Sequence, residues 1–430
     1  MLGPLSGYVA PAMSTQPMTL VASFVLLGLS QVPAPTPDGS SPSARGAGQL
    51  LIEKLDGALE TREVADPGEI RFAPDAAVFL RYTGERPKPI HGSDRARGRV
   101  ELSDGQRWTG AVAGGSGDTL RWTTELGPEL KLSVDHVVRI EFPWRIQDLD
   151  RAALEPAREG DRLYWVHGDA LERVDGTFEA FDDAGVQLTS VLGKRSFPWA
   201  EVGALFVAQL TGDSVLDEVS GAPLIVDLAD GSRLRAGFAA ADARGLVIDY
   251  PRAGKLEIPF ASLLEAALDD GSIAFLSELA PSKTQEGSLF GDDLGLRWPH
   301  RVDRSVVGSP LSVAGQRFAR GIGVHAPSRM EWDLGAAASG ARKPRTLTGM
   351  FGIDDSVRTT SARGSVRFQV HVDGEMRWES GVVRGGESVR ALPPIDIGGA
   401  THLALVVDPS EDSFVADRAN WLRLVLVRAP

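Results

Sequence analysis

The 430-residue sequence contains no cysteine and a single asparagine, Asn420. Without cysteine the chain has no disulfide bond, no thiol nucleophile, no thiolate metal site and no lipid on an N-terminal cysteine. Acidic residues outnumber basic ones, 58 to 45, so the chain lacks the basic surplus that is typical of nucleic-acid-binding proteins. No apolar run reaches the ~20 residues that span a membrane. We therefore expect no nucleic-acid partner and no membrane span.

The composition is that of a globular protein rich in strands and turns. Hydrophobic residues make up 43% of the chain and charged residues 24%, which excludes global disorder. The 48 glycines and 27 prolines favour turns and short strands over long helices. At roughly 100–200 residues per domain, the length predicts about two to four domains.

The first 44 residues differ from the rest of the chain because they contain one charged residue, Asp38. Met18–Leu29 is an apolar run of twelve residues, a length that fits a signal-peptide core of roughly 7–15 residues. A Pro/Ser/Gly-rich linker follows, in which Val32-Pro-Ala34 offers a cleavage site. Residues 1–48 are therefore predicted to be a signal-like segment and linker, and the protein to be secreted, periplasmic or on the cell surface. A buried or disordered terminus is the alternative.

Residues from about 95 to 275 contain three related patterns of alternating apolar and polar residues. Each pattern holds an Asp-Gly pair beside a strand pattern, at Asp104-Gly105, Asp175-Gly176 and Asp230-Gly231. Such a pair indicates a hairpin turn. We predict an internal repeat of β-rich units at residues 49–150, 151–212 and 213–284.

Units of this size with four or five short strands have the shape of SH3-like or Sm-like barrels. Alternation along each strand indicates one buried face. Because the region has no basic stripe, we interpret the units as packing modules or spacers, and their protein partner is unknown. One short helix is expected over Leu50–Leu59, where apolar residues follow helical spacing.

Catalytic and cofactor motifs are poorly represented in the chain. Gly321-Ile-Gly-Val-His-Ala326 fits the loose dinucleotide pattern G-x-G-x-x-A, but Pro327 stands where the required helix would begin. The seven histidines show no metal-ligand spacing, and no phosphate loop, H-E-x-x-H or G-x-S-x-G motif occurs. We therefore predict a non-catalytic protein without a cofactor.

Asp354-Asp355 is the strongest acidic pair in the sequence. Glycoside hydrolysis needs two carboxylates that face each other across a sugar, whereas neighbours on a strand point to opposite faces. We interpret the pair as turn carboxylates or calcium ligands. A glycoside hydrolase with an unrecognised site in residues 50–280 is the weaker alternative.

Residues 285–430 have the pattern of a separate all-β domain. Strand-like segments lie at Phe318–Val324, Ser328–Leu334, Thr346–Ile353, Ser365–Val372, Met376–Val383, Ala391–Ile397, His402–Val407 and Leu422–Val427. Asp373-Gly374 joins two of them as a hairpin signal. The segments predict a β-sandwich, or jelly roll, so the expected fold class is mainly β: small barrels followed by a sandwich.

Ordered sequence blocks give this region a resemblance to a known family. The blocks are Ser309–Ser328, Phe351-Gly-Ile-Asp-Asp355, Gly364–Val370, Asp373-Gly374, Ser380–Gly386, Leu403–Asp408 and Asp417-Arg-Ala-Asn-Trp421. In this order they resemble the NPCBM domain, the carbohydrate-binding module first noted beside family 98 glycoside hydrolases and also grouped as carbohydrate-binding module family 51. The resemblance implies a β-sandwich that binds terminal sugars such as galactosides, with calcium in some members.

Carried over by position, the resemblance assigns carbohydrate binding to His325, Asp417, Asn420 and Trp421. These residue types suit a sugar, because an indole covers apolar C–H surface while an imidazole and an amide bond hydroxyls. Arg418 and Asn420 stand where the family has His and Asp, which predicts an altered ligand preference or lost sugar binding. We therefore predict an exported, non-catalytic carbohydrate-binding protein. The alternative is a structural or assembly protein outside the cytoplasm whose sandwich no longer binds sugar.

Overall fold

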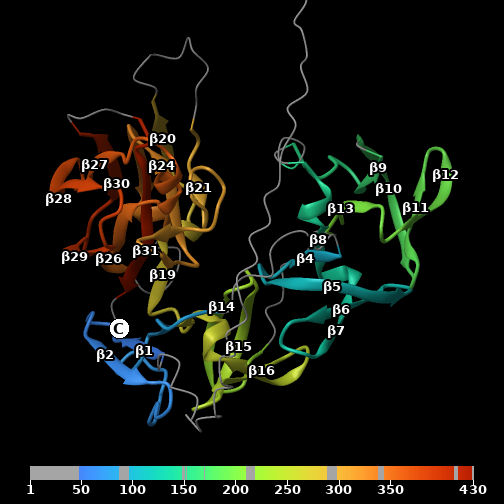
Figure 1. The fold of residues 1–430 in the computed structure, drawn as a ribbon, viewed down its shortest axis with the longest axis horizontal. Helices are drawn as coiled ribbons and strands as arrows, with labels where there is room; N and C mark the ends of the chain where they lie inside the picture. The colour runs from blue at the N-terminus through green and yellow to red at the C-terminus, as the bar shows by residue number, and fades with distance from the viewer. Residues whose placement is uncertain are drawn as a thin grey trace, which may run out of the picture. The chain divides into compact units, whose positions relative to one another are not determined.

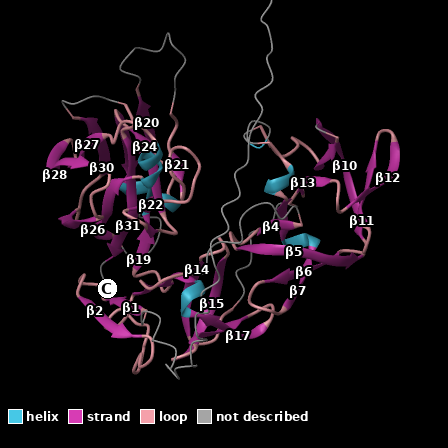
Figure 2. Cartoon of the chain, viewed as in Figure 1, coloured by secondary structure: helices cyan, strands magenta, loops and turns pink. Residues whose placement is uncertain are grey.

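The computed structural model describes residues 48–86, 96–147, 151, 153–168, 170–209, 218–287, 298–337, 343–410 and 415–428. Its regular structure is almost entirely β-strand (Figure 1 and Figure 2), which confirms the predicted fold class. The described residues all belong to one compact unit. The predicted signal-like segment and linker lie outside the described residues, apart from Gly48. Within the described part, no helix has the length and apolar character needed to cross a membrane.

Strands open the described chain where the sequence predicted a short helix. They are β1 (Gln49–Glu53), β2 (Leu59–Glu63) and β3 (Phe79–Tyr82), and β1 pairs antiparallel with both others. The helix expected over Leu50–Leu59 is therefore wrong. Leu50 and Ile52 are buried, at 0% and 3% exposure. Their buried side chains therefore follow the two-residue period of a strand and not the spacing of a helix.

The middle region consists of three consecutive groups of strands. The first unit contains β4 (Arg97–Leu102), β5 (Arg107–Ser116), β6 (Thr119–Thr124), β7 (Glu129–Ser133) and β8 (Val137–Glu141). The second contains β9 (Asp161–His167), β10 (Ala170–Phe181), β11 (Gly185–Ser190), β12 (Gly193–Pro198) and β13 (Val202–Phe206). The third contains β14 (Ala222–Leu228), β15 (Arg233–Asp242), β16 (Gly245–Tyr250), β17 (Gly254–Pro259) and β18 (Leu263–Leu268). Short 3-10 helices are η1 (Val134–His136), η2 (Pro143–Arg145) and η3 (Phe260–Ser262).

The same pairing order recurs in these three units. Four strands form an antiparallel meander, and the fifth pairs back onto the first: β8 with β4, β13 with β9 and β18 with β14. Further pairs join β8 to β13 and β3 to β18, and one hydrophobic core runs through all of these strands. The internal repeat and the barrel class stay predictions.

Two of the three expected Asp-Gly turns are present. Gly105 and Gly231 both lie in turns between paired strands, with φ of 80° and 95°, a region that favours glycine. Asp175 and Gly176 instead lie inside β10, where Asp175 pairs with Arg162 across the ladder. The turn expected at Asp175-Gly176 is therefore wrong, since this part of the chain stays extended.

The C-terminal region contains the remaining strands. They are β19 (Ile273–Phe275), β20 (Lys283–Glu286), β21 (Arg301–Val302), β22 (Ser312–Val313), β23 (Gln316–Arg317), β24 (Gly321–His325), β25 (Ser328–Asp333), β26 (Pro344–Ile353), β27 (Ser365–Val372), β28 (Glu375–Arg384), β29 (Arg390–Asp396), β30 (His402–Pro409) and β31 (Arg418–Arg428). Short helices are η4 (Leu276–Glu278), α2 (Leu334–Ala337) and η6 (Asp355–Thr359). All eight predicted strand segments are strands, from β24 to β31.

Apart from β22 and β23, which form a separate two-stranded sheet, these strands form the two sheets of a sandwich (Figure 1). One sheet has the order β21-β24-β31-β26-β29 with β19 beside β31, and the other has the order β20-β25-β30-β27-β28. Both sheets contribute to one core that includes Trp332, Phe351, Phe368 and Trp421. Because β19 and β20 begin before residue 285, the sandwich uses chain on the N-terminal side of the boundary expected from the sequence.

Buried ion pairs join the sandwich to the third unit. The Arg320 guanidinium lies 3.1 Å from Asp227 Oδ2, and Arg233 Nε lies 2.6 Å from Asp227 Oδ1. Arg233 also reaches Asp303 of the sandwich, at 2.9 Å. Burial would raise the pKa of Asp227, but the charges of Arg320 and Arg233 lower it overall. The carboxylate is therefore held ionised between two guanidiniums.

Candidate functional site

Two blocks that are distant in the sequence meet in the six-stranded sheet. β24 pairs with β31, so that His325 lies opposite Arg418 and Gly323 opposite Asn420. β31 also pairs with β26, which places Gly352 on the other side of Asn420. The residues that were predicted to bind sugar therefore gather where β24 ends and β31 begins.

Trp421 belongs to the core of the sandwich. Its side chain is 1% exposed, and its ring centroid lies 4.9 Å from that of Phe368 at an interplanar angle of 84°. The Phe351 ring packs on it at 6.4 Å. A buried indole offers no face to a ligand, so the stacking surface expected of Trp421 is not formed.

Asn420 ties the strands to the loops that cover the sheet. Its side chain is fully buried, and its Nδ2 donates to Asp354 Oδ2 at 2.7 Å. A Cβ on either glycine neighbour would clash, at 2.4 Å from Arg304 O for Gly323 and 2.7 Å from Val313 Cγ1 for Gly352. The backbone therefore packs closely around Asn420. Its side-chain amide binds Asp354 and is not exposed to solvent.

Asp417 is buried at the start of the same strand. Its Oδ1 accepts a hydrogen bond from Ser365 N at 2.8 Å, and its backbone oxygen accepts one from Ala326 N at 3.1 Å. Burial raises the pKa of Asp417 to about 7, although the bond from Ser365 opposes this. Asp417 therefore links β24, β27 and β31 and lies inside the domain.

His325 is the member of the predicted set that reaches the surface. Its Nδ1 lies 2.7 Å from the Ala326 carbonyl oxygen, which can only accept, so this nitrogen is assigned the proton. Burial lowers the pKa of His325, and the charge of Arg418 lowers it further. The ring is therefore neutral near pH 7, and Nε2 is left as a hydrogen-bond acceptor.

Trp298 supplies an aromatic surface beside His325 that the sequence reasoning missed. The two rings stack with centroids 5.5 Å apart and an interplanar angle of 17°, and Trp298 is 39% exposed. The carboxylate of Glu286 at the end of β20 accepts from the backbone and the ring of His300, both at 2.6 Å, which anchors this stretch. The only signal for it in the sequence was Trp298 itself, a tryptophan that lies outside every predicted strand.

A polar pocket of about 730 Å³ opens on the five-stranded sheet, and it is lined by residues near this pair in the chain but by neither Trp298 nor His325. Its lining includes Glu286 and Pro327, two residues beyond His325. The Gln369 amide donates to Asp408 Oδ2 at 3.0 Å, and its oxygen lies 3.0 Å from His371 Nε2. A polar pocket beside an exposed aromatic ring is the arrangement expected for a sugar ligand.

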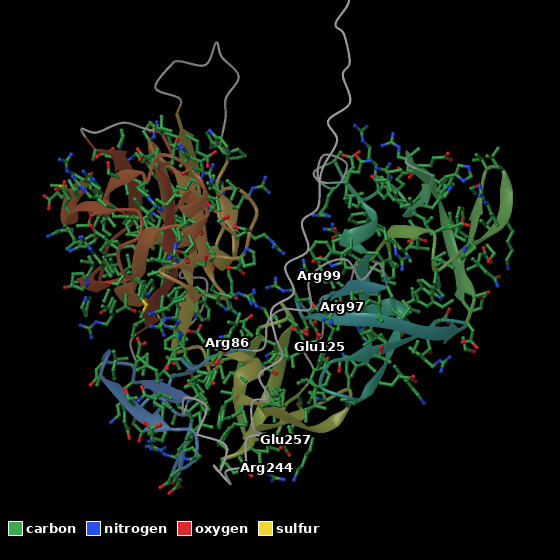
Figure 3. All side chains as sticks on the ribbon, in the orientation of Figure 1. Arg86, Arg97, Arg99, Glu125, Arg244 and Glu257 are labelled. Atoms are coloured by element: carbon green, nitrogen blue, oxygen red, sulfur yellow. The ribbon has the colours of Figure 1, made fainter. Side chains whose placement is uncertain are left out.

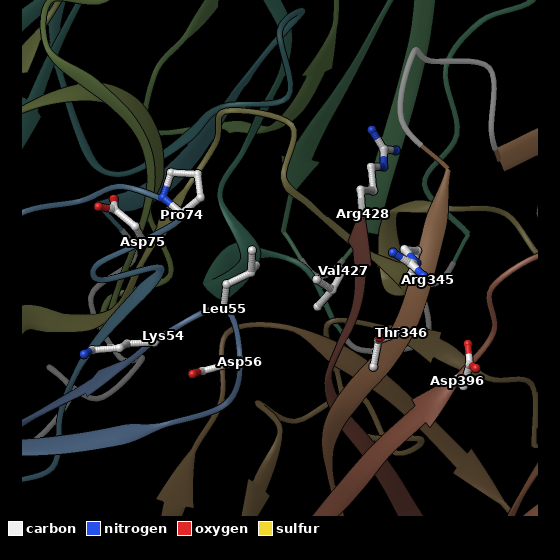
Figure 4. A pocket seen from close by; sticks show the side chains of 10 residues that line it. All are labelled: Lys54, Leu55, Asp56, Pro74, Asp75, Arg345, Thr346, Asp396, Val427 and Arg428. Atoms are coloured by element: carbon white, nitrogen blue, oxygen red, sulfur yellow. The ribbon is translucent and has the colours of Figure 1, made fainter. Parts of the chain in front are cut away.

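A second pocket, of about 620 Å³, lies between the β1–β2 turn and the ends of β26 and β31 (Figure 4). Its charged lining mixes both signs: Lys54, Arg345 and Arg428 with Asp56, Asp75 and Asp396. The lining that the structure describes contains no aromatic side chain. This pocket therefore lacks a stacking face.

Asp354-Asp355 forms a capped turn. Asp354 Oδ1 accepts from Ser356 N at 2.9 Å and so caps η6, while Asp355 Oδ2 accepts from Gly315 N at 2.8 Å. Both carboxylates thus act as turn carboxylates, as one of the two interpretations expected, and the calcium interpretation stays a prediction. Across the described residues, no three or more His, Asp or Glu side chains gather closely enough to hold a metal.

The C-terminal region is thus a two-sheet β-sandwich with an aromatic pair at one edge. Residues 273–427 match the family model described as the NPCBM/NEW2 domain, which confirms the resemblance read from the sequence blocks. The match identifies a domain within the chain, and the residues before 273 lie outside it.

Comparison with curated proteins finds Alpha-1,3-galactosidase B of Akkermansia muciniphila, which is 34% identical over 127 residues. These residues are 29% of this chain and 15% of the galactosidase, so the chain spans a small part of that relative's length.

Solved structures give similar partial matches. A family 51 carbohydrate-binding module from Clostridium perfringens GH95, in complex with methyl-galactose, is 23% identical, covering 36% of this chain and 99% of that chain with a TM-score of 0.30. The second such module of Clostridium perfringens ZmpB, with GlcNAc and INT domains, is 23% identical, covering 47% of this chain and 40% of that chain with a TM-score of 0.31. The family assignment rests on the family model.

Proposed function

We propose that the protein binds a glycan through its NPCBM domain, without covalent chemistry. The observation that carries the proposal is the exposed Trp298 ring, stacked on His325 beside a polar pocket of that domain. An indole face covers the apolar C–H side of a sugar ring, and the neutral His325 Nε2 accepts a hydrogen bond from a hydroxyl.

The buried members of the predicted set act as positioning residues. Asn420 fixes Asp354, and Asp417 fixes the chain that follows His325 through Ala326. Trp421 fills the core beneath the sheet. Their substitution would therefore change stability first and glycan affinity only as a consequence.

Isothermal titration of the full chain tests the proposal, with methyl-galactose and N-acetylglucosamine as first probes. Trp298→Ala removes the stacking face and His325→Ala removes one acceptor, so each is expected to weaken binding about ten-fold. Leu192→Ala is the control, because this apolar side chain is also exposed but lies in the second unit, away from the sandwich. Wild-type affinity in both the Trp298 and the His325 variants would place the site elsewhere.

A structural role is the second candidate function. The burial of Asp417, Asn420 and Trp421 favours it, because these positions are explained by packing alone. On this account the sandwich serves assembly, and soluble glycans leave the melting temperature of the full chain unchanged, whereas a ligand of the native state raises it. A glycan that is cleaved on incubation with the protein would instead indicate a hydrolase.

We also infer that the protein is exported, from the apolar run Met18–Leu29 and the linker that follows it. N-terminal sequencing of the mature protein is expected to show cleavage before about residue 45. Mature material that still begins at Met1 would contradict export by cleavage.

A further inference from the structure

A cavity of about 520 Å³ lies between the first and third units, away from the aromatic pair of the sandwich. Arg97 and Arg99 of β4 line it, and both point to the same side because they are two residues apart on a strand. Arg317 of β23 lines it from the sandwich. Three guanidiniums, two from β4 and one from β23, therefore line one cavity.

Carboxylates neutralise only part of this charge. Arg97 forms an ion pair with Glu125, and Figure 3 shows both beside Arg99. Within the described residues, the Arg99 and Arg317 side chains have no carboxylate partner, and Arg99 Nε is buried without a hydrogen bond. Asp230 also lines the cavity, but burial raises its pKa, which disfavours its charged form. The cavity therefore carries excess positive charge.

Neighbouring guanidiniums add to this excess. Arg86, labelled in the same region of Figure 3, donates to Leu263 O and Tyr82 O rather than to a carboxylate. Burial and, to a smaller extent, the charge of Arg317 together lower the pKa of Arg86 to about 10. Burial likewise lowers the pKa of Arg317. Desolvated cations that face one another are costly, and an anion bound among them would offset that cost.

Part of the cavity lining is apolar. Trp144, which is 49% exposed, lines it together with Leu126 and Pro143. Guanidiniums bind carboxylate and sulfate groups in bidentate fashion, and an indole stacks on the face of a ring. A lining that holds both kinds of side chain suits a ring that carries an oxyanion.

We propose that this cavity is a second ligand site, which takes an acidic sugar with a carboxylate or sulfate group held by Arg99 and Arg317 and its ring held against Trp144. A cavity of 300–1,000 Å³ is typical for a small ligand, so about 520 Å³ has room for one or two sugar rings. The proposal does not rest on the glycan site of the sandwich.

Titration of the full chain with sodium glucuronate tests the proposal, with glucose, sodium sulfate and adenosine monophosphate as comparison ligands. Glucuronate is expected to bind at least about ten-fold more tightly than glucose, and more weakly as salt rises. No glucuronate binding would overturn the proposal. If sulfate binds as tightly as glucuronate, the cavity holds an adventitious ion only, which would overturn the proposal. If adenosine monophosphate binds more tightly than glucuronate, the assignment to a sugar is wrong.

Variants locate the site. The double substitution Arg99→Gln and Arg317→Gln is expected to weaken glucuronate binding at least about ten-fold, and Trp144→Ala by several-fold without touching the core. Arg244→Gln is the matched control, because Arg244 is exposed and paired with Asp242 and Glu257 in another part of the third unit (Figure 3). Trp298→Ala is expected to leave glucuronate binding unchanged. Wild-type affinity in both the double arginine and the Trp144 variants would overturn the proposal.

Discussion

Asp417→Asn tests the buried carboxyl at the start of β31. Burial raises its pKa to about 7 from an ordinary value of 3.8. Between these values the folded state holds a proton that the unfolded chain releases, so this group's contribution to stability is full below pH 3.8 and is lost as pH rises through 7. At about 1.4 kcal/mol per pH unit, the loss reaches up to about 4 kcal/mol. Asparagine has the shape of the protonated acid and cannot ionise, so the variant should escape this loss.

Calorimetric melts of the full chain between pH 4.5 and 8.5 measure the effect. For a domain of this size each kcal/mol shifts the melting temperature by about 2–4 °C. The Asp417→Asn variant should have a melting temperature close to that of the wild type at pH 4.5 and several degrees higher at pH 8.5. The control is Asp118→Asn, because Asp118 is exposed in the β5–β6 turn. Parallel curves for wild type and the Asp417 variant would refute the reasoning.

Three further predictions concern stability and pH. Asp227→Asn removes the negative charge between Arg320 and Arg233, and urea unfolding should show a free energy of unfolding lower by about 3–5 kcal/mol. The control variant Asp242→Asn should leave the urea transition unchanged. A fragment of residues 270–430 should melt higher than one of residues 285–430, because only the longer fragment keeps β19, which pairs with β31; equal melting temperatures would count against this. Glycan affinity should be constant from pH 8 to pH 7 and fall at acid pH, as His325 Nε2 gains a proton and stops accepting; a pH-independent affinity would speak against His325.

The strands of the sandwich were predictable because their signal is local. Ser328–Leu334 and Ser365–Val372 alternate apolar and polar residues, which is the two-residue period of a strand with one buried face. His402–Val407 and Leu422–Val427 are instead short, mostly apolar runs, which suit strands buried on both faces. Periodicity also explains the error at Leu50–Leu59. The few apolar residues there fit both the helical period and the strand period, and the pairing of β1 with β3 selects the strand. At Asp175-Gly176 the long ladder of β10 with β9 outweighs the local turn preference.

The site was only partly predictable, because exposure is a property of the assembled fold. The sequence indicated that the blocks around His325 and Asn420 belong together, and the pairing of β24 with β31 shows why. It could not show that Trp421 faces the core while Trp298 stays exposed, since both are single tryptophans near polar residues. The cavity beside Arg99 and Arg317 was hidden for the same reason, as its walls come from three distant segments.

A glycan array probed with the full chain and with its Trp298→Ala variant is the most direct test of glycan binding at the aromatic pair. The account predicts that the wild type binds a defined set of glycans that share a terminal sugar, and that the variant loses this set while keeping the wild-type fold. An array on which the wild type binds no glycan, or on which the variant retains the same set, would contradict it.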